Sequence, residues 1–430
     1  MTHIATSLPA ERDLINATAI CQHWRTILLS FPRLWCNLSG PPSKIRAYVQ
    51  RSKSTPIEVE LFPPELAELI APHASRLVGL TVELNGEPSG FNQVIEHLSH
   101  PIPTLHSLRI LADRPYDVLE FPSDLQSTFC PYLRRLKIAG ILGFDGCQTF
   151  PYVTELTMHM SFPWKIERFL SILERFPVLE KLYVTFNARL SVGANPKVVT
   201  LPHVQEIKLF PFADSEVRRI WHAPPILEYL HLPNLKSLSL QMPPTLASFG
   251  LFFPIPSFGE RLPTLGELPE ARVKLGTSIG EVTFRSASQA TLEYFIRPFA
   301  NYIHYERRAW RDLPLHSVRR LIVDAVSSPS HRQIEWLVEL WEDLKFLEDL
   351  EFRGECYHAL GILPDYFDSE PLPIRTLTVR HRGERERIRA LELKRALDVV
   401  GREVTLICIP DPGAQEVTGA EMDVDGLDGE

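Results

Sequence analysis

The chain has 430 residues, of which 44% are hydrophobic and 23% are charged, the proportions of an ordinary globular protein. Its net charge of -8 is concentrated at the C-terminus, because residues 411–430 contain seven acidic residues and no Lys or Arg. The rest of the chain is almost neutral, which argues against a nucleic-acid partner. No run of about 18 apolar residues lacks an interrupting proline or charge, so we expect no membrane segment.

The first predicted helix lies near the N-terminus. Over residues 13–29, Leu14, Ala17, Cys21, Trp24 and Leu28 follow one another at intervals of three or four, which predicts one continuous helix. The sequence "SFPRLW" then ends this helix, and its last two residues are expected to fold back on the apolar stripe. Aromatic side chains this concentrated suit a small module, which needs bulky groups to close a core.

One phrase recurs along most of the remaining chain. It reads Pro, any residue, Leu or Val, two variable residues, Leu or Ile, one variable residue and an apolar residue, as in "PTLHSLRI", "PYLRRLKI" and "PVLEKLYV". Further copies lack the proline. Apart from a closely spaced copy at 227–232, the second anchors fall at positions 80, 108, 136, 156, 182, 207, 238, 321, 350 and 377. Most intervals are 20 to 31 residues, the range of a leucine-rich repeat.

Each copy of the phrase predicts a strand, and helical patterns stand between several copies. Residues 164–176 carry one apolar stripe at helical spacing, and residues 334–344 carry another. Only the interval from 238 to 321 is long, and "IGEVTF" at 279–284 is interpreted as a degraded copy within it. The prolines cannot donate to a β-ladder, so we place them at the strand entrances.

The variable strand positions distinguish an open solenoid from a closed (β/α) barrel. Barrel strands are covered on both faces, whereas here the outward positions are polar, so one face must meet water. We therefore predict an α/β solenoid with parallel concave strands and convex helices. Its concave face is either a solvated surface or a substrate-binding surface that takes an acidic or phosphorylated partner. The candidate substrate-binding residues are Arg109, Lys137, His159, Tyr183 and Lys208.

The C-terminal part combines a basic segment with an acidic tail. Residues 380–395 interleave arginines with glutamates, which indicates a solvated loop entering a helix; the alternative is a contact with phosphate or an acidic peptide. Residues 410–430 lack the apolar content to fold and are predicted to be a disordered extension.

Most common catalytic and cofactor-binding motifs are absent. The sequence contains no GxxxxGK[ST], GxGxxG, HExxH or EF-hand loop, and its histidines and six cysteines are scattered without ligand spacing. We therefore expect no enzyme activity, no cofactor and no metal. Scattered cysteines without paired spacing favour reduced thiols and a cytoplasmic or nuclear location.

The segment "SLPAERDLINATAICQHWRTILLSFPRLW", from Ser7 to Trp35, resembles the second half of an F-box of the large fungal F-box families. The resemblance rests on an "LP..DL" entry, Cys-x-x-Trp-Arg and a closing "PRLW". The following "YVQRSKSTPIEVEL" is similar to the linker helix and first strand of those proteins. Their usual first helix would precede the "LP..DL" segment, and this chain begins too late to contain it, so we expect a truncated N-terminus or weakened adaptor binding.

The resemblance implies a domain order and a function. It gives a partial F-box-like module (1–40), a linker helix and strand (41–63), an irregular leucine-rich-repeat solenoid (64–409, with a long or degenerate repeat at about 241–317) and the tail. It implies a substrate-recognition subunit that binds a Skp-type adaptor and cullin; the alternative is a repeat scaffold without a ubiquitin ligase link. The residues implied in adaptor binding, or else in the module's own core, are Leu8, Pro9, Leu14, Cys21, Trp24, Leu34 and Trp35.

Overall fold

The structure is a computed structural model with a mixed α/β architecture built on large, mostly parallel β-sheet. The chain divides into two compact units: unit 1 comprises Met1–Asp214 and Tyr229–Asn234, and unit 2 comprises Ser215–Glu228 and Leu235–Glu430. The structure describes residues 16, 18–61, 66–84, 90–98, 101–112, 118–120, 129–139, 141–143, 149–160, 164–186, 190–191, 197–211, 226–242, 258–275, 280–296, 315–327, 329, 333–334, 337–338, 340–341, 344–357, 360, 374–381, 383–399 and 404–410.

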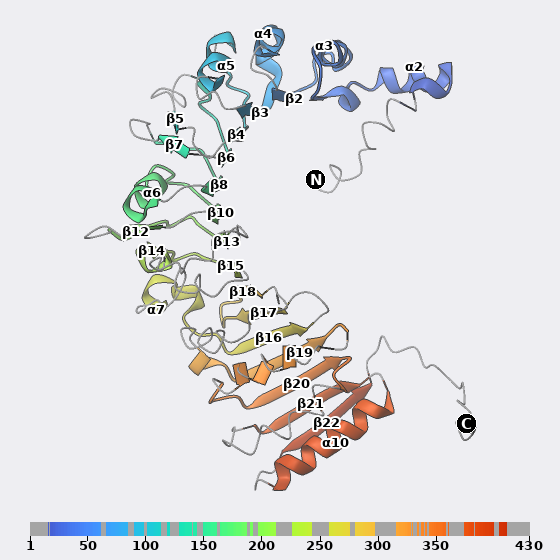
Figure 1. The fold of residues 1–430 in the computed structure, drawn as a ribbon, viewed down its shortest axis with the longest axis vertical. Coiled ribbons are helices and arrows are strands. Elements are labelled where there is room, and N and C mark those ends of the chain that lie inside the picture. The colour runs from blue at the N-terminus through green and yellow to red at the C-terminus, as the bar shows by residue number, and fades with distance from the viewer. Residues whose placement is uncertain are drawn as a thin grey trace, which may run out of the picture. The chain divides into compact units, whose positions relative to one another are not determined.

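Unit 1 begins with helical elements and continues as a series of strands, with short helices such as α5 and α6 between some of them (Figure 1). Its elements are α2 (Gln22–Ser30), the 3₁₀ helix η1 (Pro32–Trp35), β1 (Asn37–Leu38), α3 (Pro42–Arg51), β2 (Ile57–Leu61), α4 (Leu66–Ile70), η2 (Ala71–Arg76), β3 (Leu77–Leu84), α5 (Gly90–Leu98), β4 (Ser107–Ala112), β5 (Val118–Glu120), β6 (Arg135–Ala139), β7 (Ile141–Gly143), β8 (Glu155–Met160), β9 (Trp164–Lys165), α6 (Ile166–Leu173), β10 (Lys181–Phe186), β11 (Leu190–Ser191), β12 (Val199–Thr200), β13 (Glu206–Pro211) and β14 (Leu230–His231), which η4 (Ile226–Tyr229) precedes.

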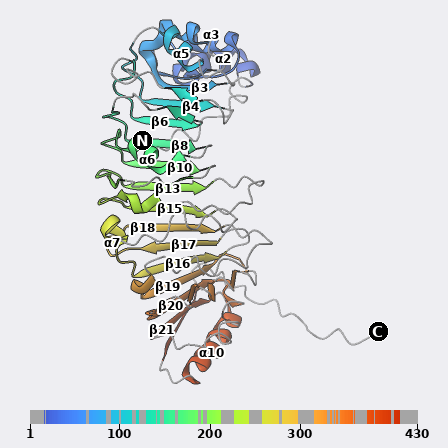
Figure 2. The ribbon, with the colours of Figure 1, turned by 60° about the vertical axis from the view of Figure 1, so that its left-hand side comes forward.

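Eight strands of unit 1 form an open, fully parallel row in the order β1-β2-β3-β4-β6-β8-β10-β13. Figure 2 shows the larger of these strands side by side. From β3 to β13 the second anchors of the repeated phrase are register partners, and each is at most 1% exposed: Leu80, Leu108, Leu136, Leu156, Leu182 and Ile207. The predicted strands of this region are confirmed. Since side chains alternate between faces, the variable positions form rows on the opposite face.

Prolines of the phrase lie in tight turns just before the strands. In five copies the amide of the first apolar anchor donates a hydrogen bond to the carbonyl of the residue before proline, over 3.0 to 3.4 Å. Proline thus occupies the second position of a β-turn, where its fixed φ is favourable. The residue before proline is a further buried anchor: Ile102, Cys130, Phe150, Phe176, Leu201 and Leu232. The rings of Phe150 and Phe176 stack with centroids 5.0 Å apart, which links successive turns.

Unit 2 contains a second strand row with one reversal of direction. Its elements are β15 (Ser237–Met242), α7 (Phe258–Arg261), η6 (Pro263–Leu265), β16 (Glu270–Leu275), β17 (Gly280–Arg285), β18 (Thr291–Ile296), η8 (Leu315–Ser317), β19 (Arg320–Ala325), β20 (Asp349–Gly354), β21 (Thr376–His381), α10 (Glu384–Val399) and β22 (Thr405–Pro410). The strand order is β15-β18-β17-β16-β19-β20-β21-β22, and only β17 runs antiparallel to its neighbours among these described strands.

The segment interpreted as a degraded repeat at 279–284 is therefore a strand of a different kind. β16, β17 and β18 form an antiparallel meander. The turn from β17 to β18 is closed by hydrogen bonds from Ser286 N to the carbonyl of Ala290 (2.8 Å) and from Ala290 N to the Ser286 hydroxyl (2.9 Å). Gln289 adopts a left-handed conformation with φ of 65° in this turn. Local side-chain capping, rather than a repeat, reverses the chain here.

The helices confirm two predicted stripes and correct a third. In α6 and the turn after it, the apolar stripe predicted over residues 164–176 is at most 2% exposed at Ile166, Phe169, Leu170, Leu173 and Phe176. Most of the stripe predicted over residues 334–344 is buried to the same extent, and residues 334, 337, 338, 340 and 341 are helical. The continuous helix predicted over 13–29 is wrong at Cys21, where the backbone is extended and α2 starts anew. The Cys21 sulfur accepts a hydrogen bond from Trp24 N at 3.5 Å. The sulfur thus caps α2 by satisfying a first-turn amide.

Candidate functional site

The structure places all five predicted substrate-binding residues on one face of the unit 1 sheet. Arg109, Lys137, Tyr183 and Lys208 belong to one row of register partners, which a threonine of β8 completes. His159 lies on the same face, one row farther along β8. Arg109 is exposed and the other four are half-buried. The repeated phrase thus correctly predicted that these residues lie on one face, because side chains alternate between the two faces along each strand.

At one end of this row the cations are neutralised internally. The Lys208 ammonium lies 2.8 Å from a carboxylate oxygen of Glu206 and 5.1 Å from the centre of the Tyr183 ring, and Lys181 lies 4.0 Å from the same carboxylate. Burial acts to raise the pKa of Glu206, but hydrogen bonds from Lys208 and Tyr183 and the two lysine charges lower it. Burial and the Glu206 charge raise the pKa of Tyr183. The Glu206 carboxylate largely neutralises the two lysines, so little net charge remains to attract a ligand.

The other end of the row carries unneutralised cations. Arg109 on β4 and Lys137 on β6 are register partners, and Arg135 lies two residues before Lys137 on the same face. Within the described part of the chain, none of these three side chains forms an ion pair. Burial and the nearby Lys137 charge lower the pKa of His159. Sequence reasoning missed Arg135 because it took one outward position from each strand.

An open pocket of about 500 Å³ lies beside these cations, at the strand entrances. Its walls come from the residues just before and at the start of four successive strands: His106, Arg134, Arg135, Thr154, Glu155, Glu180 and Lys181. Tyr132 and Tyr152, each 52% exposed, follow prolines of the neighbouring turns and have ring centroids 5.8 Å apart. The lining carries both charge signs, with cations in excess.

The residues that the F-box resemblance implies in adaptor binding have different surroundings. Leu8, Pro9 and Leu14 lie outside the described residues. Cys21 and Trp24 are exposed, Leu34 is half-buried, and Trp35 is fully buried.

Trp35 closes the core of the N-terminal module. Its indole nitrogen donates a hydrogen bond to the carbonyl of Leu28 (3.1 Å), its ring meets the Tyr48 ring edge-on at 5.0 Å, and the Arg51 guanidinium lies 4.5 Å from the ring centre. Trp35 therefore joins η1 to α2 and α3 and has no surface free for a partner. This placement favours the core role that the sequence left open for it.

Helix α2 itself buries none of its side chains. Three large apolar side chains on α2 and its flanks are exposed: Ile20 by 71%, Trp24 by 50% and Phe31 by 55%. We call them the α2 apolar surface. The sequence analysis did not predict Ile20 and Phe31 as site residues. Both are large apolar residues close to the predicted apolar stripe, and this position could have indicated them. Large exposed apolar side chains on one short segment are a common feature of protein-binding surfaces.

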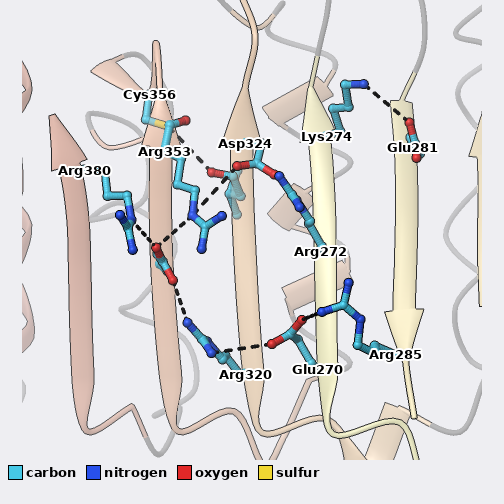
Figure 3. A network of polar contacts seen from close by, with 12 residues as sticks. Glu270, Arg272, Lys274, Glu281, Arg285, Arg320, Asp324, Arg353, Cys356 and Arg380 are labelled. Atoms are coloured by element: carbon cyan, nitrogen blue, oxygen red, sulfur yellow. Dashed lines mark hydrogen bonds and ion pairs between the residues drawn. The ribbon is translucent and has the colours of Figure 1, made fainter. Parts of the chain in front are cut away.

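In unit 2, the corresponding sheet face carries a network of paired charges (Figure 3). Three arginines from three strands bind one carboxylate: Arg320, Arg353 and Arg380 lie 2.8, 2.8 and 2.6 Å from oxygens of Glu351. The Glu351 side chain is only 5% exposed. Burial acts to raise its pKa, but the hydrogen bonds from the arginines lower it to about 2.

The network extends across neighbouring strands. Arg320 also pairs with Glu270 at 3.5 Å, and Glu270 with Arg285 at 3.4 Å. Asp324 pairs with Arg272 and lies 4.0 Å from Arg353. Each of these charged side chains has a partner of opposite charge within the network, which indicates that the network holds neighbouring strands together. Within residues 380–395, which were predicted to form a solvated loop entering a helix, Arg380 belongs to β21 and not to the loop, whereas the helix is present as α10 from Glu384 onward.

Other kinds of site were sought among the described residues. No three His, Cys, Asp or Glu side chains lie together there so as to hold a metal ion. None of the helices described is both long and apolar enough to span a bilayer. Comparison with known proteins gave no protein family whose pattern matches the chain and no curated protein with significant sequence similarity.

Proposed function

We propose that this protein is a non-catalytic substrate-recognition subunit of a Skp–cullin–F-box ubiquitin ligase. The N-terminal module binds a Skp-type adaptor through the α2 apolar surface. The strands form an open leucine-rich-repeat solenoid whose polar sheet face holds a protein substrate. The chain acts by position: it raises the local concentration of the substrate near a ubiquitin-conjugating enzyme elsewhere in the assembly.

The observation that carries this proposal is the contrast within the N-terminal module. The Trp35 side chain is fully buried and held by α3, whereas the side chains of Ile20, Trp24 and Phe31 are at least half exposed. A small module gains stability by burying its largest apolar groups, so leaving three of them in water is costly unless a partner covers them. The resemblance to the F-box names that partner as a Skp-type adaptor.

The repeat region supports the substrate side of the proposal. Parallel strands in constant register bury one face under helices such as α5 and α6 and leave the other face polar. Solenoid proteins use such faces to bind other proteins. The half-exposed polar side chains of successive strands offer many contact points on this face.

Binding to a purified Skp-type adaptor tests the proposal. We expect the full chain to form a one-to-one complex, measured by size-exclusion chromatography with light scattering. Trp24→Ala and Ile20→Ser should weaken the complex at least tenfold, while Val326→Ser, which removes an apolar side chain 57% exposed in unit 2, should leave it unchanged. A wild-type chain that binds no adaptor would overturn the proposal and favour a repeat scaffold without a ligase link.

A further inference from the structure

Strand β22 is the last strand of the unit 2 sheet, and among the described strands it pairs only with β21. The Thr405 amide donates a hydrogen bond to the carbonyl of Arg375 over 2.9 Å. Because alternate residues of a parallel strand direct their peptide groups to the same side, Ile407 also bonds to β21. The amides and carbonyls of Leu406 and Cys408 therefore point to the open side of β22. They offer two donors and two acceptors that no described strand satisfies.

The sequence of β22 does little to protect this edge from another strand. Natural sheets protect an edge by making the strand very short, by charged or proline residues within it, or by a β-bulge. At the outer edge of the unit 1 row, β1 has only two residues, whereas β22 has six, none of them charged, and its one proline, Pro410, is the last. The Ile407 side chain is 40% exposed, and α10, which packs against β21 and β22, exposes Ile388 by 48% and Leu391 by 40%. The end of the unit 2 sheet thus combines open backbone groups with exposed apolar side chains.

A second copy of β22 in antiparallel orientation complements this edge. A two-fold axis at Ile407 places Leu406 of each copy opposite Cys408 of the other, and each opposed pair exchanges two hydrogen bonds. All the open backbone groups of these residues are then satisfied, and Ile407 meets its own equivalent with no charge on either side. A register centred on Leu406 would pair only three residues of the strand. One centred on Cys408 would oppose Leu406 to Pro410, which has no amide hydrogen.

We propose that β22 pairs with β22 of a second copy of this chain and joins the two unit 2 sheets into one continuous sheet. The contact uses the same surface on both copies, so it closes as a dimer and does not extend into a fibre. Each copy contributes a strand of only six residues, so the interface is small and the dimer should dissociate on dilution. The inference goes beyond the proposed function, because the contact uses β22 and not α2.

Cysteine cross-linking of the full chain tests both the contact and its register. Ile407→Cys places two thiols directly opposite each other, with Cα atoms about 4.5 Å apart, within the range of a disulfide. This variant should form a covalent dimer on mild oxidation at least tenfold faster than the wild type, which supplies the background from the native cysteines. Thr405→Cys is the matched control. Its thiol lies opposite Ile409 of the second copy and roughly 13 Å along the strand from its own equivalent, so it should not exceed the background.

Analytical ultracentrifugation over a wide concentration range measures the dimer without cross-linking. Ile407→Lys sets two like charges opposite each other and should weaken the dimer at least tenfold. Val326→Lys, at another exposed apolar position of unit 2, should leave it unchanged. Thermal unfolding of both lysine variants at the wild-type temperature excludes misfolding as the cause of a lost dimer.

A wild-type chain that stays monomeric at every concentration would overturn the inference, as would equal cross-linking of Ile407→Cys and Thr405→Cys or a dimer that Ile407→Lys leaves intact. In a monomeric chain, slow alkylation of the thiol introduced at position 407 would indicate that another segment of this chain covers the edge. Rapid alkylation would leave the edge to a different protein. Adaptor binding measured on the same samples separates this inference from the proposed function, because adaptor binding depends on α2.

Discussion

Glu351→Gln tests the charge network of unit 2. A carboxyl whose pKa falls from its ordinary 4.5 to about 2 on folding stabilises the folded state by about 3 kcal/mol at neutral pH. The side chain is 5% exposed, so solvent screens little of this energy. Because the pKa is depressed, the stabilisation is complete above about pH 4.5 and is lost as the pH falls toward 2. We therefore expect the variant to lose about 2–3 kcal/mol at pH 7 and almost nothing near pH 2.

Amide hydrogen exchange of β19, β20 and β21 measures this loss locally. The matched control is Glu281→Gln, because Glu281 pairs with Lys274 at 3.8 Å and both side chains are more exposed. Such a pair contributes less than about 0.5 kcal/mol. The reasoning is refuted if Glu351→Gln and the control have the same opening free energy at pH 7, or if the deficit of Glu351→Gln persists unchanged at the lowest pH.

Four further substitutions probe other parts of the structure. Gly354 has φ of 75°, and an added Cβ would lie 2.2 Å from the Ala325 carbonyl oxygen, so Gly354→Ala should cost more than about 2 kcal/mol in chemical denaturation. Trp35→Ala should cost about 3–5 kcal/mol and Trp24→Ala less than about 0.5 kcal/mol; equal losses would mean that α2 is packed rather than exposed. Lys137→Gln should raise stability by a few tenths of a kcal/mol, up to about 1 kcal/mol, and a clear loss of thermal stability would show that Lys137 has a favourable partner.

The strands of the repeat were predictable because their signal is local. An apolar anchor such as Leu136 and its partner two residues later fix which face is buried, and register then follows from burial of that face. The antiparallel pairing of β16, β17 and β18 was not predictable in the same way. The turn from β17 to β18 contains no glycine, and Gln289 adopts the left-handed conformation instead, so the usual hairpin signal is missing.

Within the candidate sites, the contacts that matter join distant positions. Glu351 is a variable strand position in the sequence, and its partners Arg320 and Arg380 lie 31 and 29 residues away. Only strand register brings them together. Likewise, Trp24 and Trp35 belong to one motif, yet one is exposed and the other buried. Periodicity predicted a helix there but could not show that Cys21 interrupts it.

Hydrogen exchange across residues 16–51, with and without a purified Skp-type adaptor, tests most directly whether the α2 apolar surface is a docking site. We predict that the adaptor slows exchange of the α2 amides around Trp24 and leaves exchange of β19, β20 and β21 unchanged. Formation of a stable complex without any slowing in α2, or no complex at all, would contradict the account.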